Sequence, residues 1–347
     1  MIGLKQLSRE CGLSTSTVSN VLSSRGRHSQ ATRERVFAMA KQYGYTPSRL
    51  ASSLCGKTSS TVAVLATDIT HPYYAEVLDS VARALLKIGL EPMVGIAPWD
   101  NPEEAGKLYK SFLSWRPRGF LLITFGEVIP GLTAEHVEQV QKNAVLITIN
   151  RAVWKECPAV YPDNRRSMEL VVDHLTALNH RRIGFLNLSS RPECYRTRLL
   201  NDVLTSRGLA LRTDDILSRP LPEEIGEDAA GLWFDLGKEF AARTDRPTAL
   251  ISRSEPLANW FLGGFLSAGG RVPSDLSIIT HNNSRNAGMA SVPLTAVGVP
   301  TGRLAEQTIE LLQEAFSRRE AGEAFQKQVQ LEPELRVRMS TGPARCP

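Results

Sequence analysis

The chain has 347 residues, of which 42% are hydrophobic and 22% are charged. These ordinary values exclude a disordered chain and a small disulfide scaffold. The net charge of +5 is uneven, because residues 1–58 hold nine bases and two acids, whereas the rest hold 32 bases and 34 acids. A short basic segment therefore precedes a large, nearly neutral body.

The sequence predicts neither a membrane span nor a secretory signal. Its longest apolar stretches, such as residues 119–125, are far shorter than the roughly 18 residues that a spanning helix needs. The first residues lack a charged leader followed by an apolar run. The five cysteines include no Cys-x-x-Cys pair, which is typical of reduced thiols. We expect a cytoplasmic protein without a membrane partner.

The basic segment predicts three short helices, over residues 4–11, over residues 15–23 and from Ser29 onwards. Gly12 supplies a turn after the first helix, and Ser14 can cap the second by accepting a bond from a free backbone N–H. Two helices around a tight glycine turn are typical of the helix-turn-helix, whose second helix enters the DNA major groove. The alternative is that this Ser/Thr-rich helix start is only a cap and a solvated face. These residues alone leave both interpretations open.

The chemistry of the segment is compatible with DNA. Its positive charge attracts phosphates and predicts an affinity that falls steeply with salt. The exposed face of the second helix carries Thr15, Ser16, Thr17 and Asn20, whose short side chains can reach base edges. Asn pairs bidentately with adenine, and Ser or Thr serves several bases.

Three motifs in the segment are Thr17-Val18-Ser19, Thr32-Arg33-Glu34-Arg35-Val36 and Gly44-Tyr45-Thr46-Pro47. At this gapless spacing the segment resembles the LacI/GalR family of bacterial transcription regulators. The resemblance implies that Thr15 and Ser16 read bases, and that Thr17, Asn20 and His28 also contact DNA. Asn20 stands where many members have Arg, which predicts a different preferred base.

Residues 47–58 form a short, weakly helical segment that is rich in serine, and composition alone predicts a flexible linker. They also resemble the hinge helix of the same family, with Ala51 and Leu54 in register. The resemblance implies that two hinge helices of a dimer enter the minor groove, where Leu54 is the expected wedge. Arg49 and Ser52 are the other expected DNA contacts, and Ser52 replaces the usual Arg.

From residue 61 onwards, apolar runs alternate with amphipathic stretches. We expect strands over residues 61–67, 91–96, 119–125, 144–149, 182–188, 248–252 and 276–280. We expect helices over residues 73–88, 102–115, 134–142, 165–178, 195–206, 229–242, 256–268 and 303–316. This alternation predicts an α/β body of doubly wound parallel sheets, on which ligands bind outside the carboxyl ends of the strands.

The body resembles the effector domain of the same family, through residues 68–77, 180–185 and 270–278. The resemblance implies two lobes, like those of periplasmic sugar-binding proteins, that close on a small ligand, with crossovers near residues 162, 292 and 325. The expected domains are a helix-turn-helix over 1–46, a hinge or linker over 47–58, and an effector-binding and dimerisation domain over 59–347.

The resemblance also places candidate effector contacts. They are Asp68, Tyr73, Tyr74, Arg151, Asp163, Arg196, Arg253 and Asn282. Tyrosine rings can pack on sugar surfaces, and a guanidinium can grip a carboxylate in a bidentate fork. The alternatives are core packing for the tyrosines and a surface ion pair for Arg151.

Departures from the family pattern indicate the effector class. Ser254-Glu255 replaces the usual Asn-Asp, and Thr280-His281-Asn282-Asn283 replaces Gly-Phe-Asp-Asp. An acid that binds neutral sugar hydroxyls has become Asn282, while arginines remain. We therefore expect an anionic effector, either a sugar acid or a phosphorylated sugar. Residues 113–115 followed by Gly119 resemble the gluconate-type branch of the family.

No motif of a hydrolase, nucleotide-binding enzyme or zinc peptidase occurs, and the six histidines show no ligand-like pairing. We expect no enzyme activity, cofactor or metal, and surface or structural roles for most histidines.

The favoured function is a repressor that binds a near-palindromic DNA operator as a homodimer under effector control. The alternative is a stand-alone sugar-binding protein or a sugar-modifying enzyme on the same body.

Overall fold

The computed structural model describes residues 2–22, 26–45, 59–98, 101–124, 131–187, 194–219 and 229–345. The chain divides into two compact units, Met1–Ser59 and Ser60–Pro347, which we call the head and the body. No helix in these described ranges is long and apolar enough to cross a membrane.

The described part of the head contains the three expected helices, α1 (Leu4–Cys11), α2 (Thr15–Leu22) and α3 (Gln30–Gln42). Gly12 ends α1 in the left-handed conformation at φ 61°, which glycine adopts at little cost. Ser14 Oγ accepts a bond from Thr17 N at 3.1 Å, so the expected cap of α2 is formed. Leu7, Cys11, Val18, Val21, Val36 and Ala40 form a small buried core.

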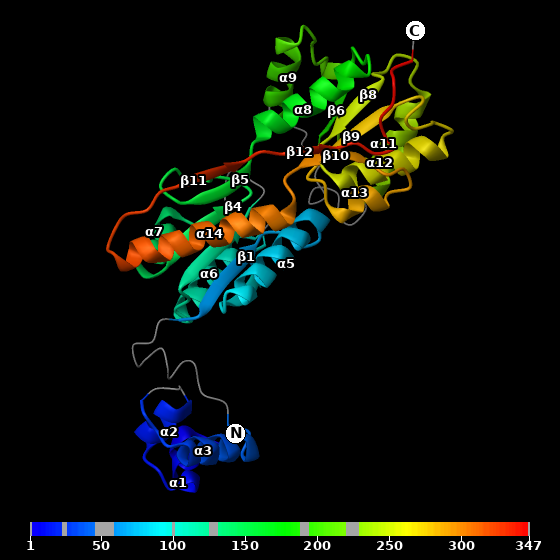
Figure 1. Cartoon of the computed structure of the whole chain (residues 1–347). Coiled ribbons are helices and arrows are strands. Elements are labelled where there is room, and N and C mark those ends of the chain that lie inside the picture. The colour runs from blue at the N-terminus through cyan, green and yellow to red at the C-terminus, as the bar shows by residue number, and fades with distance from the viewer. Residues whose placement is uncertain are drawn as a thin grey trace. The chain divides into compact units, whose positions relative to one another are not determined.

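The first lobe of the body contains a six-stranded, all-parallel sheet in the order β11-β5-β4-β3-β1-β2. Its strands are β1 (Thr61–Ala66), β2 (Glu91–Ile96), β3 (Gly119–Ile123), β4 (Val145–Ile149), β5 (Ala159–Pro162) and β11 (Gln328–Leu331). The helices α5 (Pro72–Lys87) and α14 (Thr301–Glu320) lie side by side and pack on one face (Figure 1). The helices α6 (Pro102–Ser114) and α7 (Ala134–Asn143) cover the other.

The second lobe contains another six-stranded sheet, in the order β12-β10-β9-β8-β6-β7. Its strands are β6 (Ile183–Asn187), β7 (Ile216–Ser218), β8 (Ala249–Ser252), β9 (Ser277–His281), β10 (Thr295–Gly298) and β12 (Glu334–Arg336). Only β12 runs antiparallel, against β10. The covering helices are α8 (Asn164–Ala177), α9 (Tyr195–Ser206), α11 (Ala229–Ala242), α12 (Glu255–Ser267) and the short α13 (Arg285–Met289), and a 3-10 turn, η1, spans Thr213–Asp215.

The chain crosses between the lobes three times, and two of these crossovers lie later than we expected. It leaves the first sheet after β5, as predicted near residue 162. It returns only after β10, which ends at Gly298 rather than near residue 292. It crosses again after β11, which ends at Leu331 rather than near residue 325. Both discrepancies have the same cause. In each case a short strand that we did not predict, β10 or β11, joins the sheet before the chain crosses to the other lobe.

The parallel sheets position the candidate ligand site. Both lobes turn the carboxyl ends of their strands toward the crossovers, so residues that follow β4 and β9 can meet between the lobes. One direct contact between the lobes joins helix α5 to the start of α13, where Arg285 N donates to Glu76 Oε1 at 2.8 Å.

Candidate DNA-binding helix and ligand pocket

Helix α2 of the head has one buried face and one polar, solvent-facing face. Val18 and Val21 are buried against the other two helices. Thr15, Ser16 and Asn20 are exposed and Thr17 is half-buried. Ser14 Oγ lies 2.8 Å from both Ser16 Oγ and Thr17 Oγ1, so local hydrogen bonds order the start of the helix. The uncharged side chains expected to read bases therefore lie on an accessible surface.

The charge of the head is available to a partner. The bases at positions 5, 9, 27, 33, 35 and 41 are exposed. The two acids bind uncharged side chains, since Glu10 accepts from Tyr43 at 3.1 Å and Glu34 accepts from Gln30 at 3.0 Å. His28, in the loop before α3, is half-buried, and its Nε2 has no partner among the described residues. Arg49, Ser52 and Leu54 lie outside the described residues.

A pocket in the body lies between the two lobes and includes four of the eight expected effector contacts. Tyr73 and Arg151 line it from the first lobe, and Arg196 and Asn282 line it from the second. His281, which we did not expect there, also lines it. The free volume is about 20 Å³, which is room for roughly one water molecule. A sugar-sized ligand therefore requires the lobes or the lining side chains to move.

Tyr73 fixes the first-lobe side of this pocket. Its buried hydroxyl donates to Asn150 Oδ1 at 3.0 Å, and Asn150 Nδ2 in turn donates to the Thr124 carbonyl at 2.9 Å. Asn150 has φ 76°, a sparsely populated conformation that often marks functional sites. The Tyr74 ring meets that of Tyr73 edge-on at 5.3 Å, and burial raises the pKa of Tyr74 to about 12. Both hydroxyls are therefore neutral donors.

Two arginines, Arg151 and Arg196, line the pocket, and a third, Arg253, lies close to Arg196. Burial and the nearby arginines, Arg253 and Arg151, together lower the pKa of Arg196 to about 10. The Nη1 atom of Arg196 is buried without a hydrogen-bond partner among the described residues. The guanidinium of Arg151 lies over the Tyr195 ring, 5.3 Å from its centroid, so this side chain stacks on an aromatic surface. A guanidinium nitrogen that is buried without a hydrogen-bond partner is costly, which favours an anionic ligand.

The two expected acids are occupied by local backbone bonds. Asp68 Oδ1 accepts from Thr70 N and Thr70 Oγ1, both at 2.7 Å. Asp163 caps helix α8 by accepting from Arg166 N at 2.9 Å. Neither acid is among the residues that line the pocket, so neither offsets the arginines there by direct contact.

Two further buried groups near the pocket escaped the sequence analysis as site residues. His281 is 6% exposed, its Nε2 has no partner in the described structure, and burial, Arg196 and Arg253 hold its pKa well below 6.5. Glu255 is fully buried at the start of α12, and burial raises its pKa to about 7. Its Oε1 accepts from Ser284 N at 2.6 Å, whereas Oε2 lacks a partner there. Both residues belong to segments where the sequence departs from the family pattern. Those departures were the only feature of the sequence by which the two residues could have been predicted as site residues.

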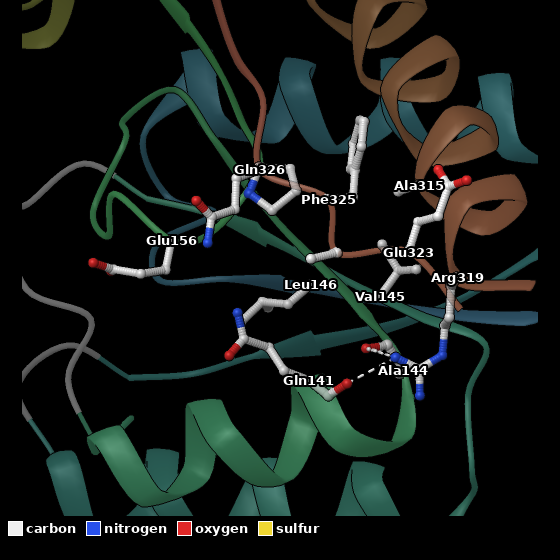
Figure 2. Close-up of a pocket in the computed structure, with 12 residues that line it drawn as sticks. Gln141, Ala144, Val145, Leu146, Glu156, Ala315, Arg319, Glu323, Phe325 and Gln326 are labelled. Carbon is white, nitrogen blue, oxygen red and sulfur yellow. Dashed lines mark hydrogen bonds between the residues drawn. The ribbon is translucent and has the colours of Figure 1, made fainter. Parts of the chain in front are cut away.

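A larger hollow of about 290 Å³ lies at the opposite, amino-terminal end of the first-lobe strands. Figure 2 shows Arg319 of α14 pointing toward the end of α7. Its guanidinium donates to the carbonyls of Gln141 at 2.7 Å and Lys142 at 2.6 Å, which satisfies the last turn of α7. Because this cation is used as a helix cap, the smaller pocket between the lobes is the stronger ligand site. The described residues include no His, Cys, Asp or Glu cluster that could hold a metal.

Comparisons with known proteins match both units. The family described as bacterial regulatory proteins, lacI family, matches residues 4–48, and that described as periplasmic binding protein-like domain matches residues 172–341. Similar sequences include the HTH-type transcriptional regulator DegA of Bacillus subtilis, 27% identical over 97% of both chains. The HTH-type transcriptional repressor PurR of Photobacterium profundum is 26% identical over 98% of both.

Solved structures show the same fold. A lac repressor dimer bound to operator and an anti-inducer has a TM-score of 0.80 at 19% identity, with 98% of this chain and 99% of that one covered. A LacI-family transcriptional regulator from Silicibacter pomeroyi has a TM-score of 0.78 at 24% identity, with the same coverage.

Proposed function

The chain belongs to the LacI family of bacterial regulatory proteins and is a DNA-binding transcriptional regulator, and we propose that its effector is a sugar acid or a sugar phosphate. The observation that carries the effector class is the buried, unpartnered Nη1 of Arg196, beside Arg253 and Arg151. The similar sequences are transcriptional regulators and a repressor, so we do not retain a sugar-modifying enzyme as an alternative.

The proposed DNA contacts divide into two kinds. The exposed bases of the head bind phosphates without regard to sequence, which gives a salt-dependent affinity. Thr15, Ser16 and Asn20 read bases in the major groove from the exposed face of α2, with Thr17 and His28 as supporting contacts. Leu54 is proposed as the minor-groove wedge, and Arg49 and Ser52 as its polar neighbours.

We propose a homodimer as the DNA-binding form, because a two-fold dimer presents two recognition helices to matched half-sites. The edge strand β2 and the end of α5 support a contact between subunits. Val94 and Ile96 on β2 are 46% and 38% exposed, and Leu86 at the end of α5 is 58% exposed. Apolar side chains on an unpaired sheet edge favour burial against a partner. Light scattering of the purified chain should give twice the monomer mass.

The proposed control mechanism uses the two lobes. The second lobe supplies Arg196 and Arg253, and the first supplies Tyr73 and Arg151. An anion that bridges these groups binds one lobe arrangement better than another and so shifts the equilibrium between them. The contact of Glu76 with Arg285 N is one of the bonds whose strength sets that equilibrium.

Two experiments test this function. Footprinting on the upstream DNA of the chain's own gene should give protection of a near-palindrome, and no sequence-specific protection would contradict the operator proposal. Calorimetric titration with gluconate, ketogluconate, sugar phosphates and neutral hexoses tests the effector. We expect tight binding of at least one anion, and tight binding of only neutral sugars would overturn the effector class.

A further inference from the structure

His281 is the last residue of β9, at the carboxyl end of a central parallel strand, where α/β sheets bind their ligands. Its side chain lines the pocket between the lobes, and only 6% of the residue is exposed. Its Nε2 atom has no hydrogen-bond partner among the described residues. Buried polar atoms in folded proteins are usually hydrogen-bonded, so an unpartnered one in a pocket requires an explanation.

The backbone around His281 is held in one conformation. Asn282 and Asn283, which follow it directly, have φ values of 86° and 54°. Asn282 N donates to the Val297 carbonyl at 2.8 Å, and Arg338 Nη2 donates to Asn283 Oδ1 at 2.7 Å. Gly298 allows the close approach, because a Cβ there would lie 2.5 Å from the Asn282 carbonyl oxygen. Two consecutive left-handed residues cost free energy, and such strain concentrates at ligand sites.

The electrostatic surroundings define what His281 can bind. Burial and two arginines, Arg196 and Arg253, keep the imidazole neutral. A neutral imidazole carries one N–H donor and one acceptor nitrogen. The Nη1 atom of Arg196, which lines the same pocket from the same lobe, is a second unpartnered donor. An oxyanion can accept from both nitrogens, whereas a neutral hydroxyl cannot offset the charge of the arginines.

We propose that His281 and Arg196 together bind the anionic group of the effector, with the Nε2–H of His281 donating to one of its oxygens. The inference rests on the proposed function. It assigns to His281 a role in ligand specificity in addition to that of Arg196. The ligand chemistry is an oxyanion, which is either the carboxylate of a polyhydroxy acid or a phosphate ester. The anion binds on the second-lobe side, because His281, Arg196 and Arg253 all belong to that lobe.

The test compares two substitutions in the full chain. His281→Phe removes both ring nitrogens, and His281→Gln keeps an amide N–H that can donate. Calorimetry uses gluconate, glucose 6-phosphate and glucose as probes, so that a carboxylate, a phosphate and a neutral sugar are distinguished. His136→Gln, at the half-buried first turn of α7 and outside the pocket, is the matched control.

For whichever anion the natural chain binds, we expect His281→Phe to weaken binding about 10-fold or more, as for loss of a hydrogen bond to a charged group. His281→Gln should retain affinity within about 3-fold, because its amide still donates, and His136→Gln should match the natural chain. Natural-like affinity of a folded His281→Phe variant for the anion would overturn the role of His281. If the natural chain binds glucose and neither anion, the proposed function fails and the inference with it. These two failures are therefore distinguishable.

A second measurement covers the case in which His281→Phe does not fold. The chain has six histidines, so nitrogen-15 labelling of histidine gives a small set of ring signals. The signal that disappears in His281→Gln belongs to His281. Addition of the bound anion should shift its Nε2 resonance more than any other, because the anion accepts from that atom. An unchanged resonance at saturating anion would contradict the proposal.

Discussion

The head and the pocket between the lobes keep their candidate functional residues in opposite environments. In the head, Thr15, Ser16 and Asn20 are exposed and water can satisfy their polar atoms. In the pocket, Arg196 Nη1 and His281 Nε2 are buried and have no partner in the described structure. Exposed polar groups cost little free energy in the absence of DNA, because water hydrogen-bonds to them. A buried donor without a partner destabilises the unliganded protein until a ligand accepts from it. The buried donors of the pocket therefore restrict the charge of the ligand more strictly than the exposed side chains of the head restrict the base sequence of the DNA.

The largest expected effect tests whether the two units function separately. Leu7 is fully buried in the small core of the head, and truncation of such a side chain costs about 2–5 kcal/mol. A core of so few residues cannot absorb that loss, so Leu7→Ala should unfold the head and abolish operator binding. The body should still bind its effector with natural affinity. Gel shift and calorimetry on the same sample measure both, and a joint loss would mean that the head and body fold as one unit.

Arg196→Met should produce the next largest effect, and it should appear only in the body. Removal of one partner of a buried charged contact costs about 2–5 kcal/mol, so anion affinity should fall about 30-fold or more. The unliganded variant should melt no earlier than the natural chain, because the substitution removes a buried guanidinium nitrogen that has no partner in the described structure. Arg198→Met, an exposed change on the same helix, is the control. An earlier melting transition in Arg196→Met would show that the guanidinium stabilises the unliganded fold.

The same contrast explains how much of the fold the sequence predicts. The helices of the head follow from local signals, namely a glycine turn, capping serines and apolar spacing, and all three form. The central strands β3, β4, β6, β8 and β9 are buried along their whole length, so their continuous apolar runs are recognisable. The strands β5, β7, β10, β11 and β12 have only three or four residues, and pairing with distant neighbours forms them. Apolar segments this short do not by themselves distinguish a strand from a helix or a loop.

The candidate site is predictable to a similar extent. Tyr73 and Arg196 were expected from family motifs, and both line the pocket. His281 was not, because its isolation in the sequence gave no ligand-like spacing. Its environment depends on Arg196 and Arg253, which lie on other elements of the second lobe. Burial and charge at a strand end are long-range properties, so residue type and spacing alone do not reveal them.

Asn20→Ala tests the exposed face of α2 in the head, and its expected effect is smaller. Asn20 is exposed on α2, and loss of one base contact costs about 1–3 kcal/mol. We expect weaker operator binding with relaxed preference at one position in each half-site, and an unchanged dependence on salt. Effector affinity should be unaffected. Selection of operators from a randomised pool gives the preference, with Gln42→Ala on α3 as an exposed control. An unchanged preference would remove Asn20 from the base-reading set.

Glu255→Gln gives the smallest expected effect. It tests how the buried carboxyl near the pocket changes the stability of the body with pH. Burial raises the pKa of Glu255 to about 7, so the native carboxyl keeps its proton at pH values where the unfolded one has lost it. Below the unfolded pKa both forms are protonated, and as pH rises through about 7 the native state loses stability relative to the unfolded chain. Gln keeps the Oε1 that accepts from Ser284 N and does not titrate.

Denaturant unfolding at pH 5 and pH 8 measures this dependence. The free energy of unfolding should fall between these values by about 1 kcal/mol or more in the natural chain beyond the change in Glu255→Gln, since one pKa unit corresponds to about 1.4 kcal/mol. Glu306→Gln, at an exposed position of α14, should follow the natural chain. The two chains share every other titrating group, so their difference isolates Glu255. Parallel pH profiles of the natural chain and Glu255→Gln would show that the carboxyl is ionised in the folded body, and that water or a cation compensates its burial.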